Sequence, residues 1–319
     1  MRLRGIGPEI LLLCFLLVGA AAFALGRRTA RGRRMRRDVE YFTGLDHLVN
    51  DRFDRATEIF TRLATRSDDA EIQFALGSLM RKRGEVDRAI AIHNELSQNR
   101  EPAIRERATF ALGLDYMSAG LLDRAEERMR DLMGSTQYRP AALEKLAWIY
   151  EQQRDWRAAL DIFREQPAEK QREGATVAAH YYCELGESAI AEHDLDAARA
   201  HLASARVHAA DAARVRMLAA RIAAASGDAQ RTLELYTTAL GGSRTIRDAF
   251  VQEAHEALAG RAAELDARLE KKLPEEPEPP RMDARFRCEH CGVGSVTWHW
   301  RCPSCRSWDS LQGVHFRAH

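Results

Sequence analysis

The sequence predicts an all-α solenoid of stacked helix pairs, with one transmembrane helix before it and a small metal-binding domain after it. Three observations predict this architecture: a residue pattern that recurs about every 34 positions, an uncharged apolar run near the start, and two Cys-x-x-Cys pairs near the end. We expect an anchor, a basic juxtamembrane segment, repeats with a capping helix, a Pro/Glu linker and a four-cysteine domain. Their expected bounds are 1–26, 27–37, 38–272, 273–281 and 282–319.

The middle of the chain is rich in Ala, Leu, Arg and Glu and poor in proline, which favours helix. Six times, a small residue near the start of an expected second helix is followed four positions later by a large one. These pairs are Ala56/Phe60, Ala89/His93, Ala125/Met129, Ala159/Phe163, Ala198/Leu202 and Thr232/Tyr236. The small residues are separated by 33, 36, 34, 39 and 34 positions. A period near 34 made of helix pairs is typical of tetratricopeptide repeats.

The expected first helices agree with this register. Twelve positions before each small residue stands another Gly or Ala, which would let the two helices of a pair approach closely. These residues are Gly44, Gly77, Gly113, Ala147, Gly186 and Ala220. We expect turns at 83–85, 119–121, 153–155, 192–194 and 226–228, and a longer connection after the fourth repeat, where the interval is 39. A single charged helix from about Thr245 to Lys272 would cap the solenoid.

In tetratricopeptide folds, the second, fifth, ninth and twelfth positions of each repeat face the concave groove. This rule predicts a partner-binding groove that contains aromatic and arginine side chains, the types that anchor protein interfaces. The predicted groove residues are Tyr41, Leu45, Phe74, Arg81, Phe110, Leu114, Glu144 and Trp148. The alternative is that some of them pack between repeats. We expect His93 to be a packed core residue and Cys183 to be a small buried or groove residue. The sequence has no Gly-rich phosphate loop, HExxH motif or Ser/His/Asp signature, which argues against an enzyme.

The last segment contains Cys288-Glu-His-Cys291 and, ten residues later, Cys302-Pro-Ser-Cys305. Two such pairs can close a tetrahedron of thiolates around one Zn²⁺ or Fe ion, and four sulfurs leave no open position for water or substrate. The sequence therefore predicts a structural metal site, with two disulfides as the alternative and the choice between iron and zinc open. We expect Gly292 to take a positive φ, and four aromatic residues to pack around the metal: Phe286, Trp298, Trp300 and Trp308.

The start of the chain has an uncharged run from Ile10 to Leu25, followed by seven arginines within 27–37. The positive-inside rule then predicts a single-pass protein with a periplasmic N-terminus and cytoplasmic C-terminal domains, and the arginines would bind anionic lipids. A cleaved signal peptide is the alternative, which the arginines and the free thiols oppose. The net charge is +1, with +8 in residues 1–37 and −7 in the remainder, which argues against nucleic-acid binding by the soluble part.

The order of these parts resembles the lipopolysaccharide assembly protein B family of Gram-negative bacteria. The residues that carry the resemblance are Tyr41-Phe-Thr-Gly-Leu-Asp-His-Leu-Val-Asn50, the stretch from Arg287 to Gly292, and the stretch from Trp300 to Cys305 with Trp308. The resemblance covers nearly the full chain, although this chain is shorter than those proteins by roughly two repeats of this period.

The resemblance implies a rubredoxin-type domain with Cys288, Cys291, Cys302 and Cys305 as ligands. It also implies a non-enzymatic inner-membrane adaptor that promotes destruction of the lipid A biosynthesis deacetylase by a membrane-bound ATP-dependent zinc metalloprotease. An inner-membrane protein that senses lipopolysaccharide would restrain it. The alternatives are a rubredoxin-type electron-transfer protein, a zinc ribbon that binds nucleic acid, a periplasmic assembly factor and a general membrane scaffold. A homodimer stays open.

Overall fold

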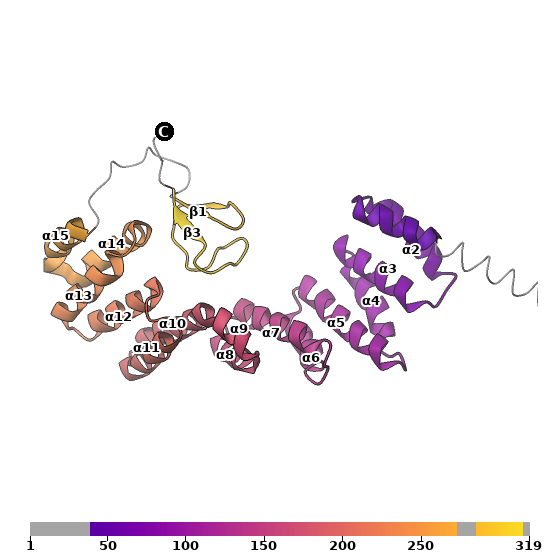
Figure 1. Cartoon of the computed structure of the whole chain (residues 1–319), viewed down its shortest axis with the longest axis horizontal. Coiled ribbons are helices and arrows are strands. Elements are labelled where there is room, and N and C mark those ends of the chain that lie inside the picture. The colour runs from indigo at the N-terminus through magenta and orange to yellow at the C-terminus, as the bar shows by residue number, and fades with distance from the viewer. Residues whose placement is uncertain (1–38, 273–284, 315–319) are drawn as a thin grey trace, which may run out of the picture. The chain divides into compact units, whose positions relative to one another are not determined.

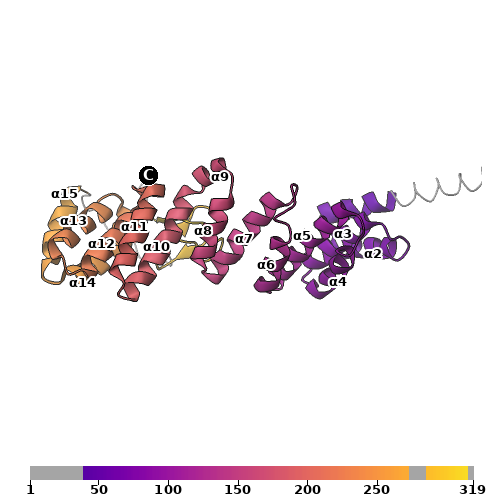
Figure 2. The same cartoon turned by 90° about the horizontal axis from the view of Figure 1, so that it is seen from below.

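The computed structural model describes residues 39–272 and 285–314. The chain divides into two compact units, Met1–Ile149 and Tyr150–His319, with the boundary inside helix α7. Figures 1 and 2 show that the described part is made of helices stacked in pairs, followed by a small three-stranded ribbon. The predicted helical solenoid with a small cysteine-rich end is confirmed.

Unit 1 contains a helix over 39–49, then α2 (Phe53–Ala64), α3 (Ala70–Lys82), α4 (Val86–Leu96), α5 (Pro102–Ser118), α6 (Leu122–Arg130) and most of α7 (Arg139–Gln153). Unit 2 continues with α8 (Trp156–Glu165), α9 (Ala168–Glu173), α10 (Ala175–Ala191), α11 (Leu195–Ala209), α12 (Ala213–Ala225), α13 (Ala229–Leu240), α14 (Arg244–Leu258), the 3₁₀ turn η1 (Ala259–Arg261) and α15 (Ala262–Lys272). The ribbon is formed by β1 (Phe286–Cys288), β2 (Gly294–Ser295) and β3 (Leu311–Gly313), which lie antiparallel in the order β2-β1-β3.

The small-and-large pattern marks the core of the helix pairs. Every residue of the six pairs except Phe163 is at most 8% exposed. Close approach explains the glycines on the first helices, because a Cβ on Gly77 would lie 2.5 Å from the His93 ring and one on Gly113 would lie 2.6 Å from Met129. Gly186 differs from the expectation, since its neighbour is Leu218 on the next first helix.

The turns between paired helices share one backbone feature. Their middle residues, Gly84, Gly120, Arg154, His193 and Gly227, all have a positive φ between 57° and 80°. Glycine adopts this conformation without a steric penalty, whereas other residues do so at a cost. In three of these turns the next residue also caps the second helix, since the side chains of Asp155, Asp194 and Asp228 accept hydrogen bonds from backbone amides of the first turn.

The predicted longer connection after the fourth repeat is confirmed, because it contains the extra helix α9. The local register changes there. Ile162 is 2% exposed and takes the core position, while Phe163 is only half-buried and packs edge-on against His208, with ring centroids 5.5 Å apart.

The prediction of one capping helix from Thr245 to Lys272 is wrong. The chain forms α14 and α15 instead, with a break at Ala259, whose φ is 41°. The break lets α15 fold back against α13, where Leu265 and Leu269 are at most 2% exposed. Burial of these two leucines is the physical reason for a helix pair at this end.

The predicted anchor at 1–26, the basic segment at 27–37 and the linker at 273–281 lie outside the described residues. Among the helices that the structure describes, none is long and apolar enough to cross a membrane.

The turn backbone gives a stability prediction. Gly227→Ala should lower the free energy of unfolding by about 1 kcal/mol, since a Cβ at positive φ is disfavoured by roughly that amount. No heavy atom lies within 4 Å of the added Cβ, so the effect is a backbone effect. His193→Ala is the matched control, because His193 is exposed and already carries a Cβ at φ 60°. Urea denaturation should give a change below about 0.5 kcal/mol for the control. Equal effects of the two substitutions would contradict this explanation.

Candidate metal centre

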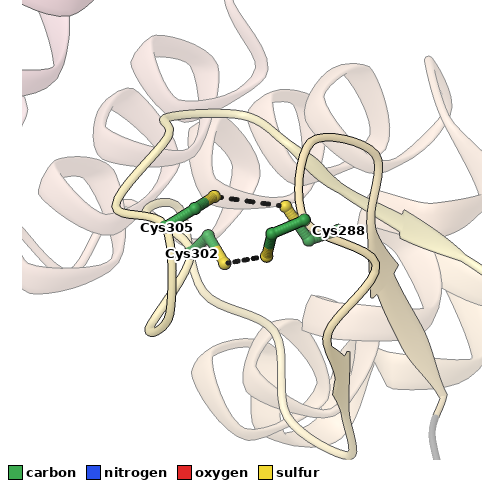
Figure 3. Close-up of side chains that lie close together, drawn as sticks. Cys288, Cys302 and Cys305 are labelled. Atoms are coloured by element: carbon green, nitrogen blue, oxygen red, sulfur yellow. Dashed lines mark hydrogen bonds between the residues drawn. The ribbon is translucent and has the colours of Figure 1, made fainter. Parts of the chain in front are cut away.

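Four cysteine sulfurs converge at one end of the ribbon. The sulfurs of Cys288, Cys291, Cys302 and Cys305 all lie within 4.8 Å of one another, and the described cysteines are free thiols. The Cys288 sulfur lies 3.6 Å from that of Cys305, two residues labelled in Figure 3, and the Cys291 sulfur lies 3.7 Å from that of Cys302. A tetrahedron with zinc–sulfur bonds of about 2.3 Å has edges of about 3.8 Å. The donor set and its spacing therefore fit one tetrahedrally bound metal ion.

Two tight turns position the sulfurs. After β1 ends at Cys288, the Gly292 amide donates to the Cys288 carbonyl oxygen at 2.9 Å, and Gly292 has a φ of 73°, as predicted. The second turn repeats this arrangement, because the Arg306 amide donates to the Cys302 carbonyl oxygen at 3.0 Å and Arg306 has a φ of 65°. Each Cys-x-x-Cys pair thus forms one knuckle.

The surroundings of the sulfurs favour thiolates at two of the four positions. Hydrogen bonding to the Ser310 hydroxyl, 3.3 Å away, and to backbone amides lowers the pKa of Cys288 to about 6. The Ser307 hydroxyl, 3.4 Å from Cys305, lowers the pKa of that thiol. Burial raises the pKa of Cys302 to about 11, so this thiol must release its proton when a metal binds.

The ribbon has very little hydrophobic core of its own. Within its described residues, the buried apolar side chains are Phe286, Cys288, Cys302 and Leu311, and two of these are expected metal ligands. Trp298 packs edge-on against Phe286, with ring centroids 5.5 Å apart, as predicted. So small a core needs a further source of folding free energy, and a structural metal can supply it.

The ribbon binds the helical repeats of unit 2 through Glu151 at the end of α7. The Arg301 guanidinium donates to the Glu151 carboxylate at 2.5 Å, and the Trp308 indole donates to it at 3.2 Å. Tyr181 of α10 also donates to this carboxylate, at 2.6 Å. Arg301 and Glu151 are 12% and 13% exposed, so the pair is largely shielded from water. Three donors therefore converge on one buried carboxylate.

Aromatic contacts extend this interface over α10 and α14. Trp308 stacks on His180 with ring centroids 4.6 Å apart, and His180 Nε2 lies 2.7 Å from a carboxylate oxygen of Asp309. Trp300 stacks on Phe250 of α14 at 5.3 Å. Figure 1 shows the ribbon beside α14, where the Gly313 amide donates to the Thr245 hydroxyl.

The prediction for the aromatic residues was therefore only partly right. Trp298 packs on Phe286 of the ribbon and also against the helical core of α12 to α15, and Trp300 and Trp308 contact the repeats as well. Sequence reasoning also missed Glu151, His180 and Arg214, which form the receiving face. Arg214 is 2% exposed, pairs with Glu184 at 2.7 Å, and lies over the ring of Trp300 at 5.7 Å. The only sequence signal was their place on expected first helices, and it does not single them out.

The predicted groove residues lie in unit 1 and differ in exposure. Trp148 is 37% exposed on α7, whereas Phe74 is 4% exposed and packs between His93 and Arg107. Arg81 donates to the buried carboxylate of Asp115 at 2.6 Å. Tyr41, Leu45, Phe110 and Leu114 are half-buried, and Glu144 is exposed. The partner-binding role of this set stays a prediction.

The two suspected core residues have the expected surroundings. His93 is fully buried, and its Nδ1 lies 2.5 Å from Asp115. Cys183 is also fully buried, and burial raises the pKa of its thiol to about 12. A thiol with so high a pKa stays protonated at neutral pH and is a poor nucleophile.

Known proteins match both parts of the chain. Residues 286–312 match the family described as the rubredoxin metal binding domain, and residues 142–174 match the tetratricopeptide repeat family. Lipopolysaccharide assembly protein B of Escherichia coli strain K12 is 28% identical over 382 aligned positions, which cover 96% of this chain and 98% of that protein. The protein of the same name from Haemophilus influenzae is 24% identical, over 98% of this chain and 99% of that one.

The resemblance to the lipopolysaccharide assembly protein B family is confirmed. The alignment with the E. coli protein also bears on length, because 96% of 319 residues is about 306, which leaves about 76 of the 382 positions opposite gaps in this chain. That difference corresponds to roughly two repeats. Among solved structures, Pseudomonas aeruginosa pilF is 19% identical over 70% of this chain and 99% of that one, with a TM-score of 0.38.

The pKa of Cys288 gives a pH prediction for metal loss. Thiolate binding competes with protonation, so bound zinc should be released as the pH falls. Ser310→Ala removes the hydroxyl that lowers the pKa of Cys288, which raises that pKa and moves zinc release to higher pH. A shift of about half to one pH unit is expected, because one hydrogen bond is worth about 1 kcal/mol. Ser304→Ala, at an exposed serine between Cys302 and Cys305 in the other knuckle, is the control. A chromophoric zinc chelator follows the release, and identical midpoints for both variants would contradict the assigned role of Ser310.

Proposed function

We propose that this chain is a non-enzymatic adaptor at the inner membrane that regulates lipopolysaccharide synthesis. In this proposal it promotes proteolysis of the lipid A biosynthesis deacetylase by a membrane-bound ATP-dependent zinc metalloprotease. An inner-membrane protein that senses lipopolysaccharide restrains it. The observation that carries the proposal is the similarity to Lipopolysaccharide assembly protein B, which extends over 96% of this chain. A match confined to the repeats would support only a general scaffold, because a fold alone does not fix a function.

The helical repeats support a binding role. Stacked helix pairs present extended surfaces to partners, and this chain has two units of them. In unit 1 the indole of Trp148 is exposed on α7, and exposed tryptophans frequently carry much of the binding energy of an interface. We infer that the client or the protease contacts this part of unit 1.

The sequence before residue 38 supports the membrane location. An uncharged run and a cluster of arginines are typical of a membrane anchor with anionic lipids on its basic side. An anchor would confine the adaptor, its client and a membrane protease to one surface, which raises their effective concentration. Adaptor activity of this kind needs no catalytic residue in the chain itself.

The test is affinity purification of the full-length protein from membranes, followed by mass spectrometry. The matched variant is Cys302→Ser/Cys305→Ser, which removes two of the four metal ligands. The proposal predicts that a membrane protease and the lipid A deacetylase copurify with the native protein and are depleted with the variant. Recovery of redox enzymes in their place, or of no protein that depends on the cysteines, would overturn it.

A prediction for the client surface follows from Trp148. Trp148→Ala should lengthen the half-life of the deacetylase in cells several-fold, because the loss of one interface tryptophan weakens binding by about 2 kcal/mol or more. Val207→Ala, on the exposed face of α11, is the control and should leave the half-life unchanged. Pulse-chase labelling measures both, with immunoblots to confirm equal abundance of the two variants. An unchanged half-life in the Trp148 variant would exclude this residue from the client surface.

Electron transfer by a rubredoxin-type centre is a second candidate, and one observation favours it. Cys291 and Cys305 are exposed, so a bound metal would lie close to the surface on that side. A working electron carrier must hold iron with a reversible potential. Metal analysis and voltammetry of the purified protein test this directly, and a zinc-filled site would exclude it.

A further inference from the structure

The residues through which the ribbon contacts the repeats lie next to its metal ligands in the sequence. Arg301 immediately precedes Cys302, and Trp308 and Asp309 follow Cys305 within four residues. All three contact the helices of unit 2, through Glu151 and His180. The position of these side chains therefore depends on the shape of the second knuckle, which the metal closes.

The face under the ribbon has a chemistry that suits one kind of ligand. Glu151 accepts hydrogen bonds from a guanidinium and an indole of the ribbon, and His180 provides a flat ring against which the same indole stacks. Arg214 lies under the rings of Trp300 and Trp308, 5.7 Å and 5.6 Å from their centroids. The ribbon thus covers this face with one arginine, Arg301, and two tryptophans, Trp300 and Trp308.

The ribbon does not satisfy every polar group on this face. Within the described residues, Nε and Nη1 of Arg214 and Nδ1 of His180 are buried without a hydrogen-bond partner. Arg214 is 2% exposed and His180 is 1% exposed. A buried polar atom without a partner destabilises the arrangement that buries it. An occupant with a carboxylate or carbonyl oxygen beside Arg214 would accept hydrogen bonds from these two guanidinium nitrogens, which the ribbon leaves without a partner.

We propose that this face, formed by Glu151, His180 and Arg214, is a second protein-binding surface, and that the metal-loaded ribbon is its removable occupant. The partner is a protein segment that carries arginine and tryptophan side chains and an acceptor for Arg214. Loss of the metal breaks the contacts of Arg301 and Trp308 with Glu151 and His180 and exposes the face. This inference goes beyond the adaptor proposal and does not depend on the identity of the client.

Because the ribbon is covalently linked to the face, metal binding can determine whether the face is covered. The ribbon belongs to the same chain as the face, so its effective concentration there is on the order of millimolar. A separate segment of micromolar affinity at cellular concentration does not displace it. When the metal is lost, Arg301 and Trp308 are no longer held in one geometry, and the advantage of linkage is lost with it.

The first experiment follows the position of the ribbon in the full-length protein in lipid nanodiscs. Nitroxide labels are attached through p-acetylphenylalanine at Val207 on α11 and Val296 on the ribbon, which are 83% and 61% exposed. With zinc bound, double electron–electron resonance should give one narrow distribution of distances between the two labels. After chelation the distribution should broaden, and it should narrow again when zinc is added. A narrow distribution that survives chelation would overturn the proposal.

Two variants separate the contacts made by Arg301 and Trp308 from metal binding itself. Arg301→Ala/Trp308→Ala should broaden the distance distribution while one zinc per chain is retained, because the four ligands are untouched. Cys302→Ser/Cys305→Ser should lose both the zinc and the narrow distribution. A narrow distribution in the Arg301/Trp308 variant would show that these side chains do not hold the ribbon, and the proposal would fail.

The second experiment tests the exposed face for binding. The probe is a fluorescent linear peptide of residues 299–310, with Cys302→Ser and Cys305→Ser, measured by anisotropy. It should bind the chelated protein at least about tenfold more tightly than the zinc-loaded protein. Glu151→Gln should abolish this binding, and Glu169→Gln, at an exposed residue of α9, should not. Absence of saturable binding up to about 1 mM, or equal binding with and without zinc, would overturn the proposal.

Discussion

Convergence of four cysteine sulfurs on one point is the constraint on which the end of this chain depends. The ribbon has only a handful of buried residues, and its strands are two or three residues long. A unit of this size does not fold on hydrophobic burial alone. Arg301 and Trp308, which flank the second knuckle, share the Glu151 carboxylate. A metal held by the two knuckles would therefore fix a surface at some distance from its own ligands.

The repeats supply the other half of that surface. Ion pairs connect successive first helices of unit 2: Arg221 of α12 pairs with Glu187 of α10 at 2.8 Å and with Glu253 of α14 at 2.8 Å. Burial alone would raise the pKa of Glu253, but the Arg221 guanidinium brings it below its ordinary value. Such largely buried pairs are costly to break on one side, since the remaining charge is left without a partner. They hold α10, α12 and α14 in the register that the ribbon contacts.

The helices could be predicted from the sequence because repeat packing is local and periodic. Gly77 with His93, and Gly113 with Met129, are sixteen residues apart in the chain and in direct contact. The four cysteines could be predicted for the same reason, since a two-residue gap brings a pair of sulfurs together. The break at Ala259 could not, because nothing in a charged helical stretch marks an alanine with a positive φ.

The docking of the ribbon could not be predicted either, for a physical reason. Arg301 and Glu151 are 150 positions apart, and no periodicity relates them. A tryptophan near a metal site can pack inside a small core or against another part of the chain, and both choices bury the same apolar area. Trp298 does both, since it packs on Phe286 and against the helical core, whereas Trp308 stacks on His180 of the repeats. Only the arrangement in space distinguishes them.

The central claim is that metal binding and docking of the ribbon are coupled. Coupling is reciprocal: if metal binding favours docking of the ribbon, docking favours metal binding to the same extent. A substitution that prevents docking must therefore weaken metal binding. The most direct measurement is the zinc affinity of the full-length protein and of its Glu151→Gln variant, which leaves every metal ligand unchanged. The account predicts a zinc affinity lower by roughly fivefold or more in the variant, within the usual range of such couplings. Equal affinities would contradict it, because the ribbon would then bind its metal without any help from the repeats.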